Sequence, residues 1–494
     1  REFDTQLSLR ALFESPTVAR LSAEVEKARS GGASQRPRLL ADPTRREAPP
    51  TVMQERIRFV EELLPGRSVY HEPSAHRLSG PFDRAVFDRA LKTVFARQST
   101  LRTAFGVDAH GASVQVIAPE VAVDMPFEDL SGVPADALEA ELYRRMQAVI
   151  ETPMNLAVPP LCHLRLYRLA DDDHVFLFVP HHLIWDGWSF DLLYNEMAMV
   201  YQAIADGTVD ALPPLPVSYA DYAVWHQQFL QSDEYRGQLT YWKGRMLDAP
   251  VPRPWPANRL HRQSANDIGG SEWVHVDKAL TERLREIARE FDVTPSMLCL
   301  AVYAALTQRM ADDSAVVIGL PVRGRQMPEI ESVMGFFNNL VTVQLPSRDD
   351  EPVGAFLARV RAEMLEVFSH QDVPFETLVK EPELMPRMQR AGLYQVMFSF
   401  QDTRERKRQW GPLSHRNVLV HHQGASNDMG LWLMEVPEGL EGAVVYNASL
   451  FAREAVVRIR EQYLRMLRRL AERPALTVGE LIGEFGAGDA VLTG

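Results

Sequence analysis

Two adjacent histidines, His181 and His182, precede an Asp-Gly pair, Asp186 and Gly187. They follow a short run rich in β-branched and aromatic residues, 174–179, which predicts a buried strand. Neighbouring side chains of a strand point to opposite faces, so one imidazole can face a channel while the other packs inside. A neutral imidazole can take a proton from an attacking group near neutral pH. The segment therefore indicates acid–base chemistry at a turn between a strand and a helix.

The residues alone leave other interpretations of the histidine pair open. The pair can be purely structural, with its ring nitrogens satisfied inside the core. Metal binding is less well supported, because no third and fourth ligand stand at zinc spacing in the sequence. A Ser-His-Asp hydrolase is also weakly supported, because the sequence has no Gly-x-Ser-x-Gly elbow before a helix. A later pair, His421 and His422, has no Asp-Gly after it and is interpreted as structural.

The residues that follow the histidines must hold them in place. Gly187 can adopt backbone angles closed to other residues, so the turn can be tight. Asp186 lies beside a hydrophobic turn, and a buried carboxylate there requires a cation such as an arginine. Ser189 is predicted to cap the next helix. The apolar face of that helix comprises Leu193, Met197, Val200 and Tyr201.

The wider pattern alternates helices and strands without a regular repeat. Apolar spacing predicts helices over 86–95, 295–306 and 456–470. Strands are expected over 314–320 and 442–449. Because both halves of the chain contain both kinds of element, the sequence favours an α/β fold of two sandwiches of similar build.

The chain has a short N-terminal region, a linker and a long body. Residues 1–30 contain two short amphipathic helices, with Ser15 and Pro16 between them, and these cannot bury a core alone. Residues 31–50 are rich in Gly, Pro and charge, which predicts a linker. From 51 to 485 the chain is densely patterned, so the two lobes expected for 494 residues must be intimately joined.

The composition is that of a globular protein, with 46% hydrophobic and 24% charged residues. No apolar stretch approaches the roughly 18 residues that a membrane span needs, and the N-terminus lacks the pattern of a signal peptide. Cys162 and Cys299 lie in apolar runs and are interpreted as buried packing residues. A net charge of −13 argues against a nucleic-acid partner. These features favour the cytosol.

Residues 181–189, His-His-Leu-Ile-Trp-Asp-Gly-Trp-Ser, resemble the His-His-x-x-x-Asp-Gly signature of the condensation domains of nonribosomal peptide synthetases. Further segments resemble other motifs of that family in the family's order: 101–105, 219–225, 319–325, 335–339, 370–376 and 395–401. Some positions depart from the family pattern: Gln98 and Ser99 stand for His-Glu, and 53–56 and 387–390 match poorly. Because these segments occur together and in the family's order, the resemblance is specific to this family.

The resemblance implies two chloramphenicol acetyltransferase-like lobes in a V-shaped pseudo-dimer, with a tunnel between them. The first lobe is expected over 51–228 and the second over 229–485. Residues 1–30 resemble the C-terminal helices of an upstream peptidyl carrier domain. Residues 486–494 are expected to start a linker to a downstream adenylation domain.

The family joins a carrier-bound acyl or peptidyl thioester, the donor, to the amine of a downstream carrier-bound aminoacyl thioester, the acceptor. The resemblance makes His182 the catalytic residue, either as a general base or as a group that orients the amine or stabilises the tetrahedral intermediate. It pairs Asp186 with Arg325 across the lobe junction and packs His181 on the opposite face. The supporting motif also includes Gly187, Trp188 and Ser189, and the resemblance implies that Gly187 provides room close to the reacting centre.

The same resemblance implies substrates tethered to phosphopantetheine, with neither a covalently bound cofactor nor a metal in the domain itself. Its expected partners are the donor and acceptor carrier domains and an adenylation domain, with no nucleic acid and no membrane. The identities of donor and acceptor stay open. Residues 426–432 resemble variants that accept polyketide-like or otherwise modified acyl donors.

Three classes of related domain give alternative functions. Epimerization domains usually carry Val-Ser-Trp-Arg after the Asp-Gly, whereas residues 188–191 are Trp-Ser-Phe-Asp. Heterocyclization domains replace both histidines by aspartate. Recruitment platforms, which bind carriers or tailoring enzymes without catalysis, usually lose the second histidine or the Asp-Gly. The sequence therefore favours condensation.

Overall fold

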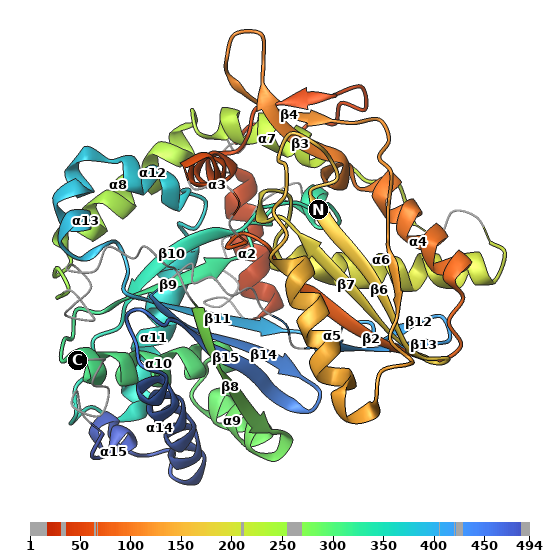
Figure 1. The fold of residues 1–494 in the computed structure, drawn as a ribbon. Coiled ribbons are helices and arrows are strands. Elements are labelled where there is room, and N and C mark those ends of the chain that lie inside the picture. The colour runs from red at the N-terminus through yellow and green to blue at the C-terminus, as the bar shows by residue number, and fades with distance from the viewer. Residues whose placement is uncertain are drawn as a thin grey trace.

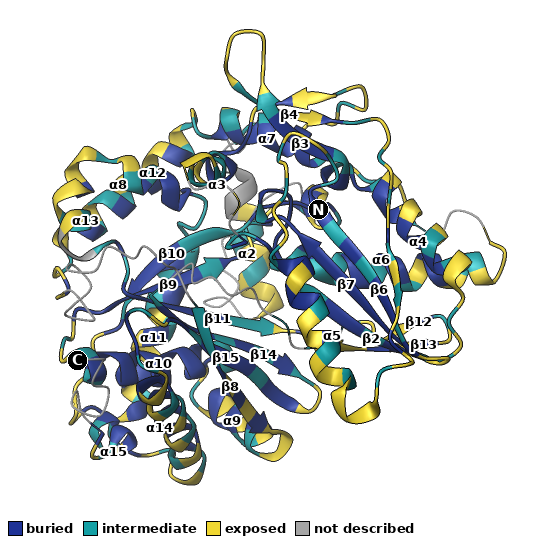
Figure 2. Cartoon of the chain, viewed as in Figure 1, coloured by how far each residue is buried: buried dark blue, intermediate teal, exposed yellow. Residues whose placement is uncertain are grey.

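The computed structural model describes residues 17–30, 36–63, 66, 68–208, 212–253, 269–404, 406–418, 420 and 428–485. Within these ranges two α/β lobes lie side by side, each built on a six-stranded sheet (Figure 1). The buried side chains of both lobes belong largely to one continuous hydrophobic cluster. Figure 2 shows that the strands of both sheets are mostly buried while the outer faces of the helices are exposed. The prediction of two intimately joined α/β lobes is confirmed.

The sheet of the first lobe has the order β12-β13-β2-β7-β6-β5. Its central strand β7, Asp173–Pro180, pairs with β2, Ser74–Ser79, and β6, Cys162–Ala170, and β5, Phe127–Asp129, lies at one edge. Along β7, Phe176 and Phe178 enter the main cluster, whereas Val175, Leu177 and Val179 enter a second cluster on the other face. From Val175 onward the strand is apolar, because helices cover both faces of the sheet.

Those covering helices differ between the two faces. The main-cluster face packs α4, Arg84–Arg97, and α6, Gly187–Ala205. The opposite face packs α5, Ala135–Ile150. At the top of Figure 1, a small sheet of β1, Glu47–Ala48, β4, Ser113–Ile117, and β3, Thr103–Val107, lies near α7, Tyr219–Phe229.

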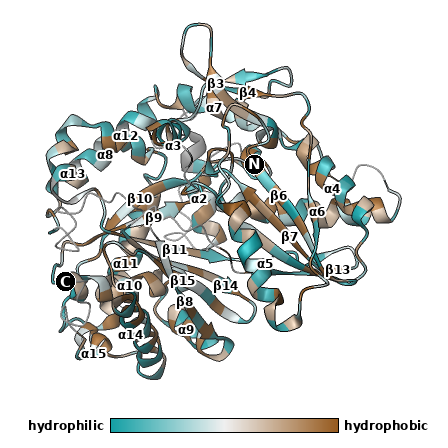
Figure 3. Ribbon diagram, in the orientation of Figure 1, coloured by the Kyte–Doolittle hydropathy of each residue, from teal (hydrophilic) through white to brown (hydrophobic). Residues whose placement is uncertain are grey.

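The sheet of the second lobe has the order β10-β9-β11-β14-β15-β8. Its strands are β8 Gly269–Asp277, β9 Val317–Val322, β10 Asn339–Gln344, β11 Val396–Asp402, β14 Met429–Val436 and β15 Gly439–Asn447. Its main helices are α9 Lys278–Glu290, α10 Pro295–Ala311, α11 Val353–Phe368 and α14 Arg453–Glu472. Figure 3 shows hydrophobic residues along the sheet and hydrophilic residues on outward faces such as that of α14.

The remaining helices lie between or beside the sheets. The first described helix, α2 Val18–Ser30, is largely exposed over residues 18–27, and α3 Val52–Leu63 contacts the short helix α12 Phe375–Lys380 of the other half. The others are α8 Asp233–Asp248, α13 Met385–Ala391 and α15 Val478–Ile482, with the 3₁₀ turns η1 Ser99–Arg102, η2 His182–Ile184, η4 Pro328–Ile330 and η5 Pro382–Leu384.

One strand pair crosses between the lobes. Strands β12, Gln409–Trp410, and β13, Leu413–Val418, come from the second half of the chain but extend the sheet of the first lobe. β13 pairs antiparallel with β2, with Arg416 opposite Arg77. The expectation that 229–485 builds only the second lobe is therefore wrong for this segment, because Trp410 and Leu413 bury their side chains in the first lobe's core.

The described part of the expected linker is docked on the body. Trp225 Nε1 donates to the carbonyl of Pro37 at 2.7 Å, Arg45 Nε donates to Asp221 Oδ1 at 2.8 Å, and Glu47–Ala48 pair with β4. Residues 36–50 have the Gly- and Pro-rich composition of a connecting segment, but they are packed on the body and are not free coil. Residues 31–35, and the expected first helix with Ser15 and Pro16, lie outside the described residues.

The predicted elements over 86–95, 174–179, 295–306 and 456–470 are confirmed by α4, β7, α10 and α14. The strands expected over 314–320 and 442–449 are present but shifted, as β9 and β15. Cys162 and Cys299 are buried free thiols, and burial raises the pKa of both. No helix within the described ranges is both long and apolar enough to cross a membrane.

Candidate active site

The turn that carries the two histidines is held by backbone hydrogen bonds from both sides. The His181 amide donates to the carbonyl of Leu161 at 2.9 Å, and the His182 amide donates to the carbonyl of Tyr70 at 2.8 Å. A single 3₁₀ turn, η2, follows, and α6 begins at Gly187. The alternation of β7 continues into the turn, so that His181 and His182 point to different surroundings. The His182 side chain is 24% exposed and that of His181 only 1%.

The orientation of the His182 ring is fixed by one strong hydrogen bond. Its Nδ1 lies 2.7 Å from the carbonyl oxygen of Trp185. A carbonyl oxygen can only accept, so Nδ1 carries the hydrogen and the lone pair of the neutral ring is on Nε2. The ring also packs on Phe336 of the other lobe, with 4.5 Å between ring centroids. Nε2 therefore presents a hydrogen-bond acceptor in a defined direction.

His181 is enclosed. Its Nδ1 accepts from the Leu183 amide at 3.1 Å, and its Nε2 lies 3.7 Å from Glu61 Oε1. Burial lowers the pKa of His181 below its ordinary value, because the charged imidazolium is poorly solvated there. The ring packs against His71 with 5.9 Å between centroids. Its place is away from the cavity described below, and its contacts are those of a structural residue.

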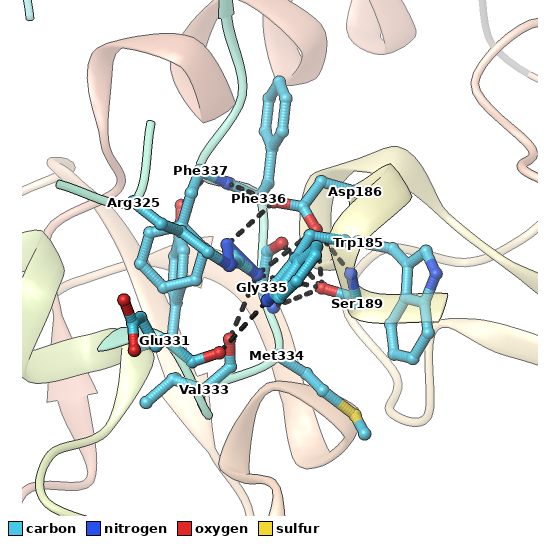
Figure 4. A network of polar contacts seen from close by, with 12 residues as sticks. Trp185, Asp186, Ser189, Arg325, Glu331, Val333, Met334, Gly335, Phe336 and Phe337 are labelled. Carbon is cyan, nitrogen blue, oxygen red and sulfur yellow. Dashed lines mark hydrogen bonds and ion pairs between the residues drawn. The ribbon is translucent and has the colours of Figure 1, made fainter. Parts of the chain in front are cut away.

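Asp186 joins the two lobes (Figure 4). Its Oδ2 accepts from Arg325 Nη1 at 3.0 Å and from the Phe337 amide at 3.1 Å. Its Oδ1 accepts from the Ser189 amide at 2.8 Å and the Ser189 hydroxyl at 2.7 Å. The carboxylate thereby caps α6 while it binds a buried guanidinium of the second lobe.

The hydroxyl of Ser189 and the guanidinium of Arg325 extend this network. Ser189 Oγ accepts from the Gly335 amide at 3.0 Å, and Arg325 Nη2 donates to the Val333 carbonyl at 3.0 Å. Burial lowers the pKa of Arg325, and the nearby charge of Asp186 opposes that effect. The prediction that Ser189 caps the helix is wrong: Asp186 is the N-cap, and Ser189 is its hydrogen-bond donor inside the first turn.

Gly187 and Trp188 are the first two residues of the helix that Asp186 caps. Gly187 is the first residue of α6, and its φ is not positive, so no special backbone angle requires glycine there. A Cβ at this position would instead lie 3.3 Å from Gln401 Nε2, on the wall of the cavity. Trp188 faces the other lobe, where Nε1 donates to the Glu331 carbonyl at 3.1 Å and Arg323 stacks 3.4 Å above the ring.

A cavity of about 380 Å³ lies between the lobes, and His182 and Gly187 are on its wall. Apolar and aromatic side chains from both halves line it, among them Tyr70, Phe336, Tyr394 and Trp432. Of the site residues named from the sequence, Asp186, Ser189, Trp188, Arg325 and His181 stand behind the cavity and support its wall. The cavity is large enough for the reacting ends of two small substrates.

Several motif segments that carried the family resemblance meet at this cavity. Phe336 and Asn338 come from 335–339, Phe375 and Glu376 from 370–376, and Ser399 and Gln401 from 395–401. The wall residues that the quoted segments do not include are several, among them Tyr70 and Glu72, which precede β2. The only available signal was the Pro73 that follows them, which marks a strand start but not a site.

Gln98, which departs from the family pattern, lies at the lobe junction. Its amide nitrogen donates to Glu196 Oε1 at 2.7 Å and to the Ser332 carbonyl at 3.1 Å, and its Oε1 accepts from the Met334 amide at 3.0 Å. Through these hydrogen bonds Gln98 joins the lobes. Within the described ranges, no group of three or more His, Cys, Asp or Glu side chains is placed to hold a metal ion.

Comparisons with known proteins agree with this geometry. The model of the Condensation domain family matches residues 44–485. The chain is 32% identical to a linear gramicidin synthase protein of Brevibacillus parabrevis over 492 residues, which cover 97% of this chain and 6% of that protein. It is 31% identical to phosphinothricin tripeptide synthetase PhsC of Streptomyces viridochromogenes over 434 residues, 88% of this chain and 40% of that protein. The chain thus spans less than half the length of these relatives.

Solved structures share the fold. The X-domain in its complex with OxyB from teicoplanin biosynthesis has a TM-score of 0.74 at 25% identity, over 92% of this chain and 100% of that one. The first condensation domain of the calcium-dependent antibiotic synthetase, in complex with a substrate analogue, has a TM-score of 0.77 at 23% identity, over 89% of this chain and 99% of that one. With the family match extending from residue 44 to 485, the chain belongs to the condensation domain family, the amide-forming acyltransferase domains of nonribosomal peptide synthetases.

Proposed function

We propose that this domain joins the acyl group of an upstream carrier-bound thioester to the amine of a downstream carrier-bound aminoacyl thioester, and that His182 Nε2 accepts the proton of that amine. The observation that carries the proposal is the position of Nε2. His182 lines the cavity between the lobes, and because Nδ1 is engaged by the Trp185 carbonyl, Nε2 is the ring nitrogen left to meet a substrate.

The bond changes follow from that position. The amine nitrogen attacks the thioester carbonyl carbon, and one of its protons passes to Nε2. The tetrahedral intermediate then collapses, the C–S bond breaks, and the proton on the imidazolium passes to the leaving sulfur. The products are an amide and a free thiol on the donor arm. Holding both reactants in one cavity can itself lower the barrier by roughly 7–11 kcal/mol.

The ring tautomer favours proton acceptance over oxyanion binding as the first role of His182. With the hydrogen on Nδ1, Nε2 has no proton to donate to a developing oxyanion until it has received one. An amine N–H, in contrast, can donate to the Nε2 lone pair of a ring that lines the cavity. The Phe336 ring on one side of the imidazole restrains its rotation.

The relatives are long synthetases of which this chain spans a small part, which supports a place within a larger cytoplasmic enzyme. In this proposal residues 1–30 are the end of the donor's carrier domain, 31–50 is the linker, and 486–494 leads to an adenylation domain. The lobes are 51–228 and 229–485, with 409–418 exchanged into the first. The phosphopantetheine arms belong to the carriers and enter as substrate.

The test is a single-turnover reaction with both carriers loaded, read by mass spectrometry of the carrier-bound products. The wild-type domain is expected to give a new amide on the acceptor carrier, whereas His182→Ala gives none and His182→Gln gives a trace. Matching circular dichroism spectra and melting temperatures show that the variants are folded. An undiminished yield from His182→Ala would refute the role of His182.

The same reaction separates this proposal from its rivals. An epimerization domain would invert the α-carbon of a carrier-bound residue without forming an amide. The fold is also that of an X-domain solved in complex with OxyB, so a recruitment platform is the third outcome, with neither change. What favours condensation is the cavity-facing Nε2 together with the intact Asp186–Arg325 support.

A further inference from the structure

Glu72 lies beside the reacting nitrogen of His182. Its amide donates to the carbonyl of Pro180 at 2.9 Å, and the preceding residue, His71, forms a β-bridge with His181. These contacts fix the backbone of Glu72 next to the catalytic turn. Its side chain lines the cavity, is 37% exposed, and brings Oε1 to 3.8 Å from His182 Nε2.

Within the described part of the chain, no basic side chain compensates the charge of this carboxylate. The charged residues on the wall, apart from His182, are Arg56, Glu72 and Glu376. Arg56 Nε and Glu376 Oε1 pair with each other at 3.0 Å. Among the residues that the structure describes, His182 is the only ionisable group paired with Glu72, and its neutral ring carries no positive charge. The cavity therefore presents one negative charge directly beside Nε2.

We infer that Glu72 is the residue that binds the acceptor's α-amino group as an ammonium and delivers it to His182. An α-amine has a pKa of about 7.7–8.0, so near neutral pH it enters mainly as an ammonium, which has no lone pair for attack. A carboxylate attracts this form, and the imidazole beside it can remove a proton. This assignment rests on the proposed function of the domain.

The distances allow one nitrogen atom to contact both groups. Two hydrogen bonds of about 2.8 Å each bridge any gap up to roughly 5.6 Å, and Oε1 and Nε2 are 3.8 Å apart. One N–H of the ammonium donates to Glu72 Oε1 and a second to His182 Nε2. Transfer of the second proton to Nε2 leaves a neutral amine with a free lone pair.

The protons then balance. Of the three on the ammonium nitrogen, one passes through Nε2 to water before the attack. Another passes through Nε2 to the leaving sulfur when the C–S bond breaks, and the last remains in the amide. The ring is therefore neutral again for the next turnover. Throughout, Glu72 keeps its charge and pairs first with the ammonium and then with the imidazolium.

A second glutamate–histidine pair provides a matched control. Glu61 Oε1 lies 3.7 Å from His181 Nε2, nearly the same distance as in the Glu72–His182 pair. Neither Glu61 nor His181 lines the cavity, so a substrate ammonium does not meet them. Glu61→Gln removes a carboxylate of α3 that contacts the same turn, without removing the charge that faces the substrate.

The experiment compares wild type, Glu72→Gln, Glu72→Asp and Glu61→Gln with two small acceptors. One is a soluble aminoacyl pantetheine thioester, used as substrate, so that carrier docking does not mask the effect. The other is the matching α-hydroxyacyl thioester, which has no positive charge and is used as a competitive inhibitor. Steady-state rates give KM and kcat for the first and an inhibition constant for the second, at several pH values.

For Glu72→Gln we expect KM for the aminoacyl acceptor to rise roughly 10- to 100-fold, as for loss of a hydrogen bond to a charged group, with little change in kcat. The inhibition constant of the hydroxyacyl analogue should stay within about twofold. For Glu72→Asp the rise in KM should be smaller than for Glu72→Gln. Glu61→Gln should leave unchanged the ratio of KM for the aminoacyl acceptor to the inhibition constant of the hydroxyacyl analogue. The Glu72→Gln deficit should shrink above about pH 8.5, where the amine is neutral.

Three outcomes would overturn the inference while leaving the proposed function intact: an unchanged KM in a folded Glu72→Gln, an equal loss for the uncharged analogue, or a deficit that does not depend on pH. Failure of the wild-type domain to form any amide would instead refute the proposed function. Melting temperatures within a few degrees of wild type show that the variants are folded. If Glu72→Gln does not fold, Glu72→Asp still tests the inference.

Discussion

Arg325 donates from Nη1 to Oδ2 of Asp186 at 3.0 Å, and neither side chain has any exposed surface. Asp186 belongs to the first lobe and Arg325 to the second, so the ion pair fixes the lobes relative to one another just behind the catalytic turn. A buried charge without its partner is costly, because the interior does not replace the lost hydration. The pair therefore controls whether the two walls of the cavity come together.

Removing one partner should destabilise the domain strongly. We expect Asp186→Ala and Arg325→Ala each to cost about 3–5 kcal/mol, and the double variant to cost clearly less than the sum of the two. The check is the midpoint of urea unfolding together with the soluble yield. Wild-type stability in Asp186→Ala, or simple additivity in the double variant, would contradict a coupled buried pair.

Gly187 leaves room on the cavity wall rather than supplying an unusual backbone angle. Because its φ is not positive and it begins α6, Gly187→Ala should leave the melting temperature unchanged or slightly higher. The added Cβ displaces Gln401 by a few tenths of an ångström, so amide formation should fall several-fold. Gly187→Leu should fill the cavity and abolish turnover in a folded protein. Equal activity of Gly187→Leu and wild type would exclude this role.

The crossing strands should be essential for the first lobe. Trp410 is fully buried there and packs on Phe87 and His415, with ring centroids at 6.0 and 4.6 Å. We expect Trp410→Ala to cost about 3–5 kcal/mol and to expose the segment 403–418 to limited proteolysis. Leu247→Ala, at an exposed helical position, is the control and should change stability little. A protected segment in folded Trp410→Ala would contradict the assignment.

The local features of the site could be predicted from the sequence. The apolar run of β7 predicts a strand, and its period of two places His181 and His182 on different sides. The Asp-Gly after them indicates where the next helix begins. The family resemblance added the partner Arg325, 139 positions away. Spacing alone gives no such long-range pair, since nothing local distinguishes Arg325 from the neighbouring Arg323.

The features that the sequence did not predict all depend on tertiary contacts. Ser189 was taken for the helix cap because serine is a good one, but Asp186 is also a good cap and has the buried cation to hold it in place. Glu72 approaches His182 only because its strand segment bridges the catalytic turn. Hydrophobic spacing could not predict that 409–418 joins the sheet of the other lobe. The alternation of side chains predicts a strand but not the strand with which it pairs.

Acid should destabilise the domain through histidines that are buried in the neutral form. Burial lowers the pKa of His71, His226 and His415 to about 4 each. Between about pH 6.5 and 4 the unfolded chain therefore binds more protons than the folded one, so stability falls as pH falls through this window. Each such histidine contributes a slope of up to about 1.4 kcal/mol per pH unit.

His226 gives the cleanest test of this effect. It is 3% exposed on α7, burial is the sole cause of its lowered pKa, and its Nδ1 has no hydrogen-bond partner among the described residues. Since Leu cannot take up a proton in either state, His226→Leu should reduce the loss of stability between pH 7 and pH 5 by about 2 kcal/mol. Urea unfolding at the two pH values measures this difference, with the exposed His110→Gln as control. The same loss of stability in His226→Leu and wild type would mean that His226 titrates alike in the folded and unfolded chains.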